Sequence, residues 1–438
     1  NESLPFDLTG DQKKVIKEIR KDFNSGKQMN RLLQGDVGSG KTIVSLMIIL
    51  IAIDNGYQSC ILAPTEILAQ QHFDSISKLL EKLNVNAELL TGSTPAKSRK
   101  NIHQKLLNNE IQILIGTHAI LEDVVKFKNL GLAIIDEQHR FGVAQRAKLW
   151  KKNASPPHIL VMTATPIPRT LAMSVYGDLD ISIIKELPPG RKKTITVHRY
   201  DKNRLSVYKF LKDQIELGRQ IYIVYPLINE SEKLDYKDLV DGYESMLRDF
   251  PRPEYQVGIL HGKMKSLDKS LEMERFINNK TQILVSTTVI EVGVNVPNAS
   301  VMMIESSERF GLSQLHQLRG RVGRGNEESY CILMTKDNLS SDAKTRTDTM
   351  VQIDDGFKLS EVDLKLRGPG DLLGTKQSGI LKFKIADIIN DHDILTKARD
   401  CVSIILSNDP KLKLAENSSI REYISLSVKS KNLWRYIS

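Results

Sequence analysis

The chain has 438 residues, of which 40% are hydrophobic and 26% are charged, and its formal net charge is +9 at pH 7. This composition is that of an ordinary globular protein, and the length predicts about three domains. There is no apolar run of about 18 residues and no signal peptide, so neither a membrane-spanning helix nor secretion is expected. The positive charge favours a polyanionic partner such as nucleic acid, although a basic surface alone has the same composition.

The first part of the chain alternates short apolar runs with amphipathic stretches. Strands are predicted at 31–33, 60–62, 113–115, 132–135 and 159–162, and crossover helices at 66–83 and 97–108. This rhythm predicts an α/β domain with a central parallel sheet over residues 1–188, which ends at the turn signal LPPGR of 187–191.

After this turn the alternation restarts. Strands are predicted at 194–198, 220–225, 257–260, 283–286, 301–304 and 330–334, and helices at 203–217 and 267–278. A second α/β domain is therefore expected over 189–336. It contains a charged segment at 230–249 whose role the sequence does not indicate, and a solvated helix is one interpretation. Residues 337–438 predict two short helices at 343–353 and 360–366, a glycine-rich loop and a helical tail.

The three cysteines lie far apart, each within an apolar stretch: Cys60, Cys331 and Cys401. This scatter predicts buried free thiols in a reducing cytosol rather than disulfides or a metal site.

Residues 35–42 read GDVGSGKT, which is a complete phosphate-binding loop. Its glycines let backbone N–H groups approach phosphate oxygens, Lys41 brings a positive charge to the β- and γ-phosphates, and Thr42 offers a hydroxyl ligand to Mg²⁺. A chance match is the alternative, but a predicted strand precedes the loop and a predicted helix follows it. The predicted nucleotide contacts are Gly35, Asp36, Val37, Gly38, Ser39, Gly40, Lys41 and Thr42.

An acidic pair follows the apolar run 132–135, in the sequence DEQH. Asp136, at the tip of a strand, can hold the Mg²⁺ shell beside the phosphate loop, and Glu137 can orient or deprotonate the attacking water. The alternative is that Asp136 and Glu137 form an exposed acidic turn without a catalytic role. The hydroxyls of the next segment, TATP at 163–166, could relay the nucleotide state or form a simple turn.

Residues 314–324 read QLHQLRGRVGR and gather Arg319, Arg321 and Arg324. Such a cluster can be a solvated or nucleic-acid-binding face. We favour an arginine finger on the second domain that points at ATP on the first, because it would make hydrolysis depend on domain closure.

The order of these blocks, with Thr287–Gly293 between the last two, resembles helicases of superfamily 2. The resemblance implies two RecA-like domains with ATP and Mg²⁺ between them. It implies adenine recognition by Phe6 and Gln12, nucleotide contact by Gly293, and completion of the site by Gln317, Arg321 and Arg324. The residues matching the strand-binding motifs are Thr65, Thr91, Thr117 and Thr287, although each could equally cap a helix.

Two further stretches, DEQHRFGVAQR at 136–146 and RGPGDLLGTKQSG at 367–379, resemble the RecG family of bacterial branched-DNA translocases. In that resemblance Arg346, Arg367 and Gln377 connect a helical hairpin to a translocation loop. The alternative interpretation is that residues 367–379 form an ordinary surface loop.

The resemblance implies an ATP-dependent DNA helicase that moves on double-stranded DNA and remodels replication forks and Holliday junctions in recombination and repair. It covers the motor half of that family, so the N-terminal wedge domain is expected to be missing. We expect a monomer, with a single-strand DNA-binding protein as a candidate partner. Three alternatives remain: a transcription-repair coupling translocase, an RNA helicase, and a non-enzymatic nucleotide-dependent nucleic-acid-binding module.

Overall fold

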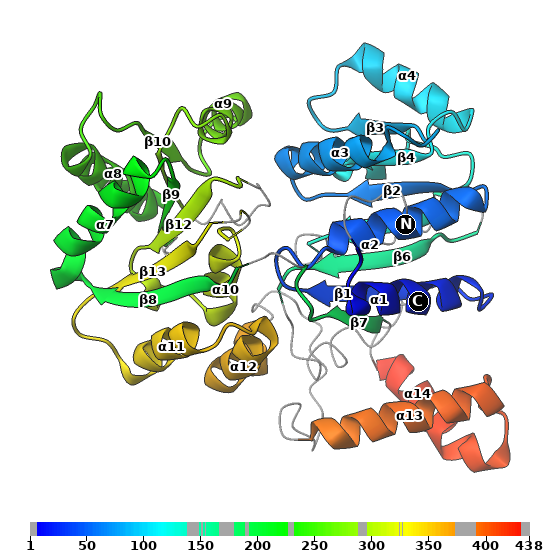
Figure 1. Ribbon diagram of the computed structural model, residues 1–438. Coiled ribbons are helices and arrows are strands. Elements are labelled where there is room, and N and C mark those ends of the chain that lie inside the picture. Colours follow the sequence, from blue (N-terminus) through cyan, green and yellow to red (C-terminus); the bar gives the residue numbers. More distant parts are fainter. Residues whose placement is uncertain are drawn as a thin grey trace.

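The fold is taken from a computed structural model. It describes residues 7–137, 149, 152–153, 155–165, 179–188, 192–226, 232–287, 296–323, 325, 327–372 and 391–430, with the backbone alone at 232–238, 266, 367–372, 392 and 427–430. Figure 1 shows two α/β units side by side and a helical region below them. The predicted fold class is confirmed.

The first unit is a parallel sheet of seven strands in the order β3-β4-β2-β5-β6-β1-β7. The strands are β1 (Asn30–Gly35), β2 (Gln58–Leu62), β3 (Ala87–Leu90), β4 (Ile113–Gly116), β5 (Leu130–Asp136), β6 (His158–Thr163) and β7 (Asp180–Ile184). The helices are α1 (Gly10–Phe23), α2 (Lys41–Asp54), α3 (Glu66–Leu80), α4 (Ala96–Leu107) and the 3₁₀ helix η1 (His118–Leu121). Leu32 and Leu33 of β1 belong to separate buried clusters, as expected for a parallel sheet covered on both faces.

The second unit is a parallel sheet of six strands in the order β10-β11-β9-β12-β13-β8. The strands are β8 (Thr194–Tyr200), β9 (Gln220–Tyr225), β10 (Val257–Leu260), β11 (Ile283–Thr287), β12 (Ala299–Ile304) and β13 (Ser329–Thr335). The helices are α7 (Arg204–Glu216), α8 (Glu232–Asp249), α9 (Ser266–Ile277), α10 (Leu312–Arg319) and the 3₁₀ helices η3 (Asp201–Asn203) and η5 (Ser307–Arg309).

The helical region consists of α11 (Ser341–Gln352), α12 (Gly356–Leu372), α13 (His392–Asn408), the 3₁₀ helix η6 (Ala415–Asn417) and α14 (Ser418–Ser430). In Figure 1, α11 and α12 lie below the second sheet, with α12 toward the first unit, and α13 and α14 lie below the first. Among the described residues, no helix is both long and apolar enough to cross a lipid bilayer.

Several local expectations need correction. The helix predicted at 360–366 is longer than expected, because α12 runs from Gly356 to Leu372 and packs through its buried Leu359 and Leu364, so residues 367–372 of the predicted glycine-rich loop are helical. The charged segment at 230–249 contains a helix, α8, but it is packed rather than solvated, since Leu239 and Met246 are fully buried.

The cysteines divide into two groups. Cys60 and Cys331 are buried free thiols, and burial raises the pKa of each to about 12. Cys401 is exposed, so its predicted burial is wrong. The apolar stretch around it lies on an outer face of α13, where Val402 and Ile404 are also exposed.

Candidate functional site

The phosphate-binding loop joins β1 to α2, as predicted. Gly38 and Gly40 have φ angles of 80° and 87°, which favour glycine. A Cβ on Gly40 would also lie 2.2 Å from Gln12 Nε2, so any larger residue there would displace the Gln12 amide. Lys41 Nζ donates to the carbonyl oxygens of Gly35 at 2.7 Å and Asp36 at 3.0 Å, so the amine lies over the loop.

Gln12 anchors the loop from the start of α1. Its Nε2 donates to the Ser39 carbonyl oxygen at 2.9 Å, and its Oε1 accepts from the backbone N–H of Thr9 at 3.0 Å in a capping box. Only 2% of Gln12 is exposed. The predicted nucleotide-recognition residue is therefore built into the loop, whereas Phe6 lies outside the described residues.

Asp136 ends β5 and is buried with both carboxylate oxygens engaged. Its Oδ2 lies 2.8 Å from His72 Nε2 on α3, and its Oδ1 accepts from the backbone N–H of Glu137 at 3.1 Å. Burial by itself raises the pKa of Asp136, but the hydrogen bond and charge of His72, with the charge of Lys41, outweigh it and lower the pKa. His72 was not among the predicted site residues, because no short motif contains it.

Glu137 is the next residue and has φ = 53°. Residues other than glycine rarely adopt this left-handed backbone conformation, and those that do are concentrated at functional sites. Burial, followed by the negative charge of Asp136, raises the pKa of Glu137 to about 7. Lys41 and Arg321 oppose this shift, so Arg321 lies close enough to influence the carboxyl group. A carboxyl group with this pKa can accept a proton near neutral pH.

The second unit reaches the loop through α10 and the turn after it. His316 Nε2 lies 3.1 Å from Asp36 Oδ1. Burial raises the pKa of Asp36, but the hydrogen bond and charge of His316, together with Lys41, lower it overall. The second unit therefore contacts the phosphate loop directly, through His316, which was not among the predicted site residues.

The residues predicted to complete the site from the second unit are only partly described. Gln317 and Arg321 are buried, with 8% and 4% exposed. Arg324 and Gly293 lie outside the described residues.

Gly320 offers a direct test of this contact. Its φ of −68° suits alanine, but a Cβ there would lie 2.8 Å from Val37 Cβ of the phosphate loop. Such overpacking costs about 1–3 kcal/mol, so Gly320→Ala should lower the maximal rate of ATP hydrolysis about tenfold by opposing this contact. Steady-state kinetics with the double variant Gly320→Ala/Val37→Gly, which removes the opposing Cβ, should recover the rate. A wild-type rate in the single variant would contradict the contact.

The environment of Arg319 is not the one expected for an arginine finger. Its side chain is buried and donates to the carbonyl oxygens of Met350 at 3.0 Å, Ile353 at 3.0 Å and Asp354 at 2.9 Å. Met350 belongs to the last turn of α11, whereas Ile353 and Asp354 lie in the turn between α11 and α12. Arg319 Nη2 also lies 3.0 Å from His316 Nδ1. One continuous set of contacts therefore runs from the phosphate loop through α10 to the hairpin turn.

The four predicted strand-binding threonines lie at carboxyl ends of strands, three of them after the neighbouring β2, β3 and β4. Thr65 Oγ1 accepts from the Leu68 N–H at 3.4 Å as the N-cap of α3, and Thr91 Oγ1 lies 2.9 Å from Ser93 Oγ. Thr117 Oγ1 and Thr287 Oγ1 are buried without a partner in the described part of the chain.

Of the three residues predicted to connect the helical hairpin to the translocation loop, the structure describes only the side chain of Arg346. Arg346 Nη2 donates to the Glu308 carbonyl oxygen at 2.8 Å, which fastens α11 to η5. Gln377 and the side chain of Arg367 lie outside the described residues.

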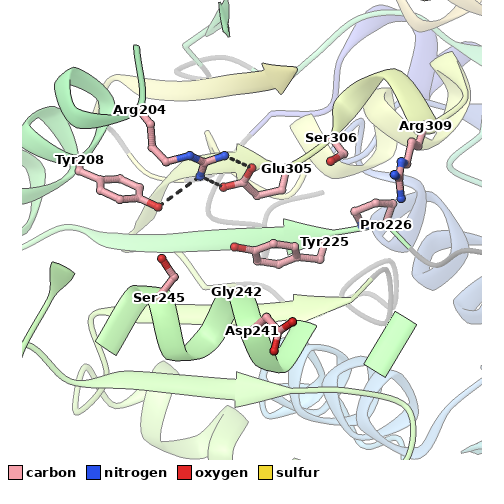
Figure 2. Close-up of a pocket in the computed structure, with 10 residues that line it drawn as sticks. All are labelled: Arg204, Tyr208, Tyr225, Pro226, Asp241, Gly242, Ser245, Glu305, Ser306 and Arg309. Atoms are coloured by element: carbon pink, nitrogen blue, oxygen red, sulfur yellow. Dashed lines mark hydrogen bonds and ion pairs between the residues drawn. The ribbon is translucent and has the colours of Figure 1, made fainter. Parts of the chain in front are cut away.

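A separate cavity of about 330 Å³ opens at the ends of β9 and β12 (Figure 2). Arg204 forks onto Glu305, with Nη2 2.9 Å from Oε2, and also donates to the Tyr208 hydroxyl. Glu305 is only 4% exposed, so this pair neutralises a buried charge. Of the predicted nucleotide and strand-binding residues that the structure describes, none lines this cavity.

Three families match the chain in order: DEAD/DEAH box helicase over residues 9–174, helicase conserved C-terminal domain over 204–326, and ATP-dependent DNA helicase RecG, domain 3, C-terminal, over 353–438. An ATP-dependent DNA helicase RecG from Bacillus subtilis is 51% identical over 420 residues, which are 96% of this chain and 61% of the relative. A relative of the same name from Synechocystis is 49% identical over 418 residues, 95% of this chain and 50% of that one. The chain belongs to the RecG family.

A solved RecG structure bound to a three-way DNA junction has a TM-score of 0.76 at 44% identity, covering 90% of this chain and 51% of that one. The DEAD-box helicase Mss116 has a TM-score of 0.59 at 19% identity, which shows the shared RecA-like helicase fold alone. The chain thus spans about half to three fifths of the RecG relatives described here.

Proposed function

We propose that this chain is the ATP-driven motor of a DNA helicase that translocates on double-stranded DNA and remodels branched DNA, such as forks and Holliday junctions. The observation that carries the proposal is the set of contacts from Asp36 through His316 and Arg319 to the turn between α11 and α12. It connects a nucleotide site to a helical hairpin, which is what conversion of hydrolysis into movement requires. A transcription-repair coupling translocase is not favoured, since the relatives and the DNA-bound structure are RecG proteins.

The roles of the site residues follow from their chemistry. Lys41 binds the β- and γ-phosphates, Glu137 accepts a proton from the attacking water, and Arg321 with Arg324 stabilises charge on the γ-phosphate. Gln317 supports them from α10. We assign the motor to 1–188 and 189–336, and the translocation hairpin with its tail to 337–438.

The loop and the carboxylate fit a magnesium–nucleotide complex. The described residues hold no group of three or more His, Cys, Asp or Glu side chains that could bind a metal by themselves. Mg²⁺ instead prefers one or two protein oxygens together with water and substrate phosphates. Thr42 and Asp136 would supply those oxygens, and the bound ion would neutralise phosphate charge during hydrolysis.

The DNA partners are proposed from the same reasoning. Thr65, Thr91, Thr117 and Thr287 would contact the sugar–phosphate backbone, while Arg346, Arg367 and Gln377 would transmit closure to the translocation loop. We place the protein in the bacterial cytoplasm as a monomer, with a single-strand DNA-binding protein as a candidate partner.

The proposal predicts a strong preference for branched DNA in ATP turnover. Initial rates measured with equal concentrations of forked DNA, four-way DNA, linear duplex and RNA should be highest for the branched substrates, by about tenfold or more over RNA. Lys41→Ala is the negative control. It should abolish DNA-stimulated turnover, because the β- and γ-phosphates lose the positive charge of the lysine. Equal stimulation by RNA, or an unaffected Lys41→Ala rate, would refute the proposal.

A further inference from the structure

His72 makes a contact that the established motifs do not explain. It lies in the middle of α3, is 7% exposed, and places Nε2 2.8 Å from Asp136 Oδ2. Asp136 Oδ1 is bound to the Glu137 N–H, so both oxygens of the carboxylate are fixed from different sides. The terminal torsion of an aspartate is otherwise broad, and removal of one of these bonds would let the carboxylate rotate.

The other end of α3 is connected to the proposed DNA-binding edge. Thr65 caps its first turn, and Glu66 accepts from the N–H and the hydroxyl of Ser93, both at 3.0 Å, in the loop that carries Thr91. From Thr65 to His72 a helix rises about 10 Å. A single helix therefore begins at one of the proposed DNA-contacting residues, Thr65, and carries the partner of Asp136 two turns later.

We propose that His72 is a positioning residue that holds Asp136 in the orientation needed by the magnesium–nucleotide complex, and that α3 transmits DNA engagement to that orientation. This inference rests on the proposed function. DNA bound at Thr65 and the Thr91 loop steadies α3, α3 fixes His72, and His72 fixes the carboxylate. Partners of metal-binding groups commonly change metal affinity by about 10–100-fold when they are lost.

Two substitutions of similar polarity separate this role from packing. In His72→Gln the amide nitrogen can occupy the place of Nε2, whereas the side chain of His72→Asn ends too short to reach Asp136. Both replace a buried polar ring by an amide, and the two variants differ by a single methylene group. Ile76→Val, one turn further along α3 and also buried, reports the effect of loosening the helix without touching Asp136.

The readout is metal binding, not turnover. Binding of Mn²⁺ to the full chain with a non-hydrolysable ATP analogue is measured by electron paramagnetic resonance, with and without forked DNA. We expect the Mn²⁺ Kd to rise about tenfold in His72→Asn, to stay within about threefold in His72→Gln, and to be unchanged in Ile76→Val. We also expect forked DNA to lower the Kd in the wild type and in His72→Gln but not in His72→Asn.

Two outcomes would overturn the inference. Wild-type affinity and DNA response in His72→Asn would show that the hydrogen bond does not position Asp136, and an equal loss in both His72 variants would assign the effect to packing. DNA-stimulated turnover of the wild type is measured in parallel. If it is present while either outcome is found, His72 is excluded and the proposed function stands; if it is absent, the proposed function itself fails.

Discussion

Glu137→Gln should lower ATP turnover by about 10²–10⁴-fold and leave the binding of nucleotide nearly unchanged, because it removes a proton acceptor but keeps the size of the side chain. The structure gives this residue two unusual properties, a left-handed backbone and a pKa raised to about 7. Single-turnover hydrolysis and equilibrium binding of a fluorescent ATP analogue would measure the two effects. Asp74→Asn, which alters an exposed acid on α3, is the matched control.

The same residue predicts a pH dependence with a definite sign. Burial and the charge of Asp136 disfavour the ionised form of Glu137, and only the ionised form accepts a proton. The value of kcat/KM should therefore rise about tenfold per pH unit below about 7 and level off above it. The residual kcat/KM of Glu137→Gln should not show this rise with pH. Turnover of Glu137→Gln at the wild-type rate, or an unchanged rise with pH in that variant, would assign the base to another group.

The sequence was sufficient for those parts of the site that short spacings encode. The phosphate loop needs particular residue types at four positions within a span of eight, and Asp136 and Glu137 directly follow an apolar run. The loop and the acidic pair lie at the same edge of the sheet, because β1 and β5 are parallel strands separated only by β6.

The contacts that join these parts were not predictable in the same way. His72 lies 64 residues from Asp136, and His316 lies 280 residues from Asp36. Their pairing depends on the packing of α3 on the sheet and on the approach of the second unit, neither of which leaves a local pattern. The edge strands β3 and β7 were missed for a related reason, since β3 is mostly half-buried and lacks a continuous apolar run.

Arg319 illustrates how residue type alone can mislead. Its spacing grouped it with Arg321 and Arg324 as a charged cluster, yet the fold turns it away toward the hairpin. A buried guanidinium that donates to three carbonyls is a structural clamp. The distinction matters for function, because Arg321 influences Glu137 while Arg319 holds the element that the nucleotide site would have to move.

Arg319→Lys should therefore separate hydrolysis from movement. Lysine keeps the charge but is a compact donor that cannot fork onto the carbonyls of Met350, Ile353 and Asp354 together. Each buried carbonyl left unpaired costs about 1–3 kcal/mol, which is enough to release the turn between α11 and α12. We expect translocation, measured by displacement of a third strand from duplex DNA, to fall at least about tenfold, while DNA-stimulated ATP turnover stays within about threefold.

The control for this variant is Arg275→Lys, which alters an exposed ion pair on α9 of the same unit and should change neither rate. Thermal unfolding of both variants would show whether the clamp also contributes to stability, and we expect a lower Tm only for Arg319→Lys. If translocation and hydrolysis fall in the same proportion, Arg319 acts at the nucleotide site after all. If neither falls, closure reaches the hairpin by another route, and the contacts between His316, Arg319 and the turn do not carry the motion.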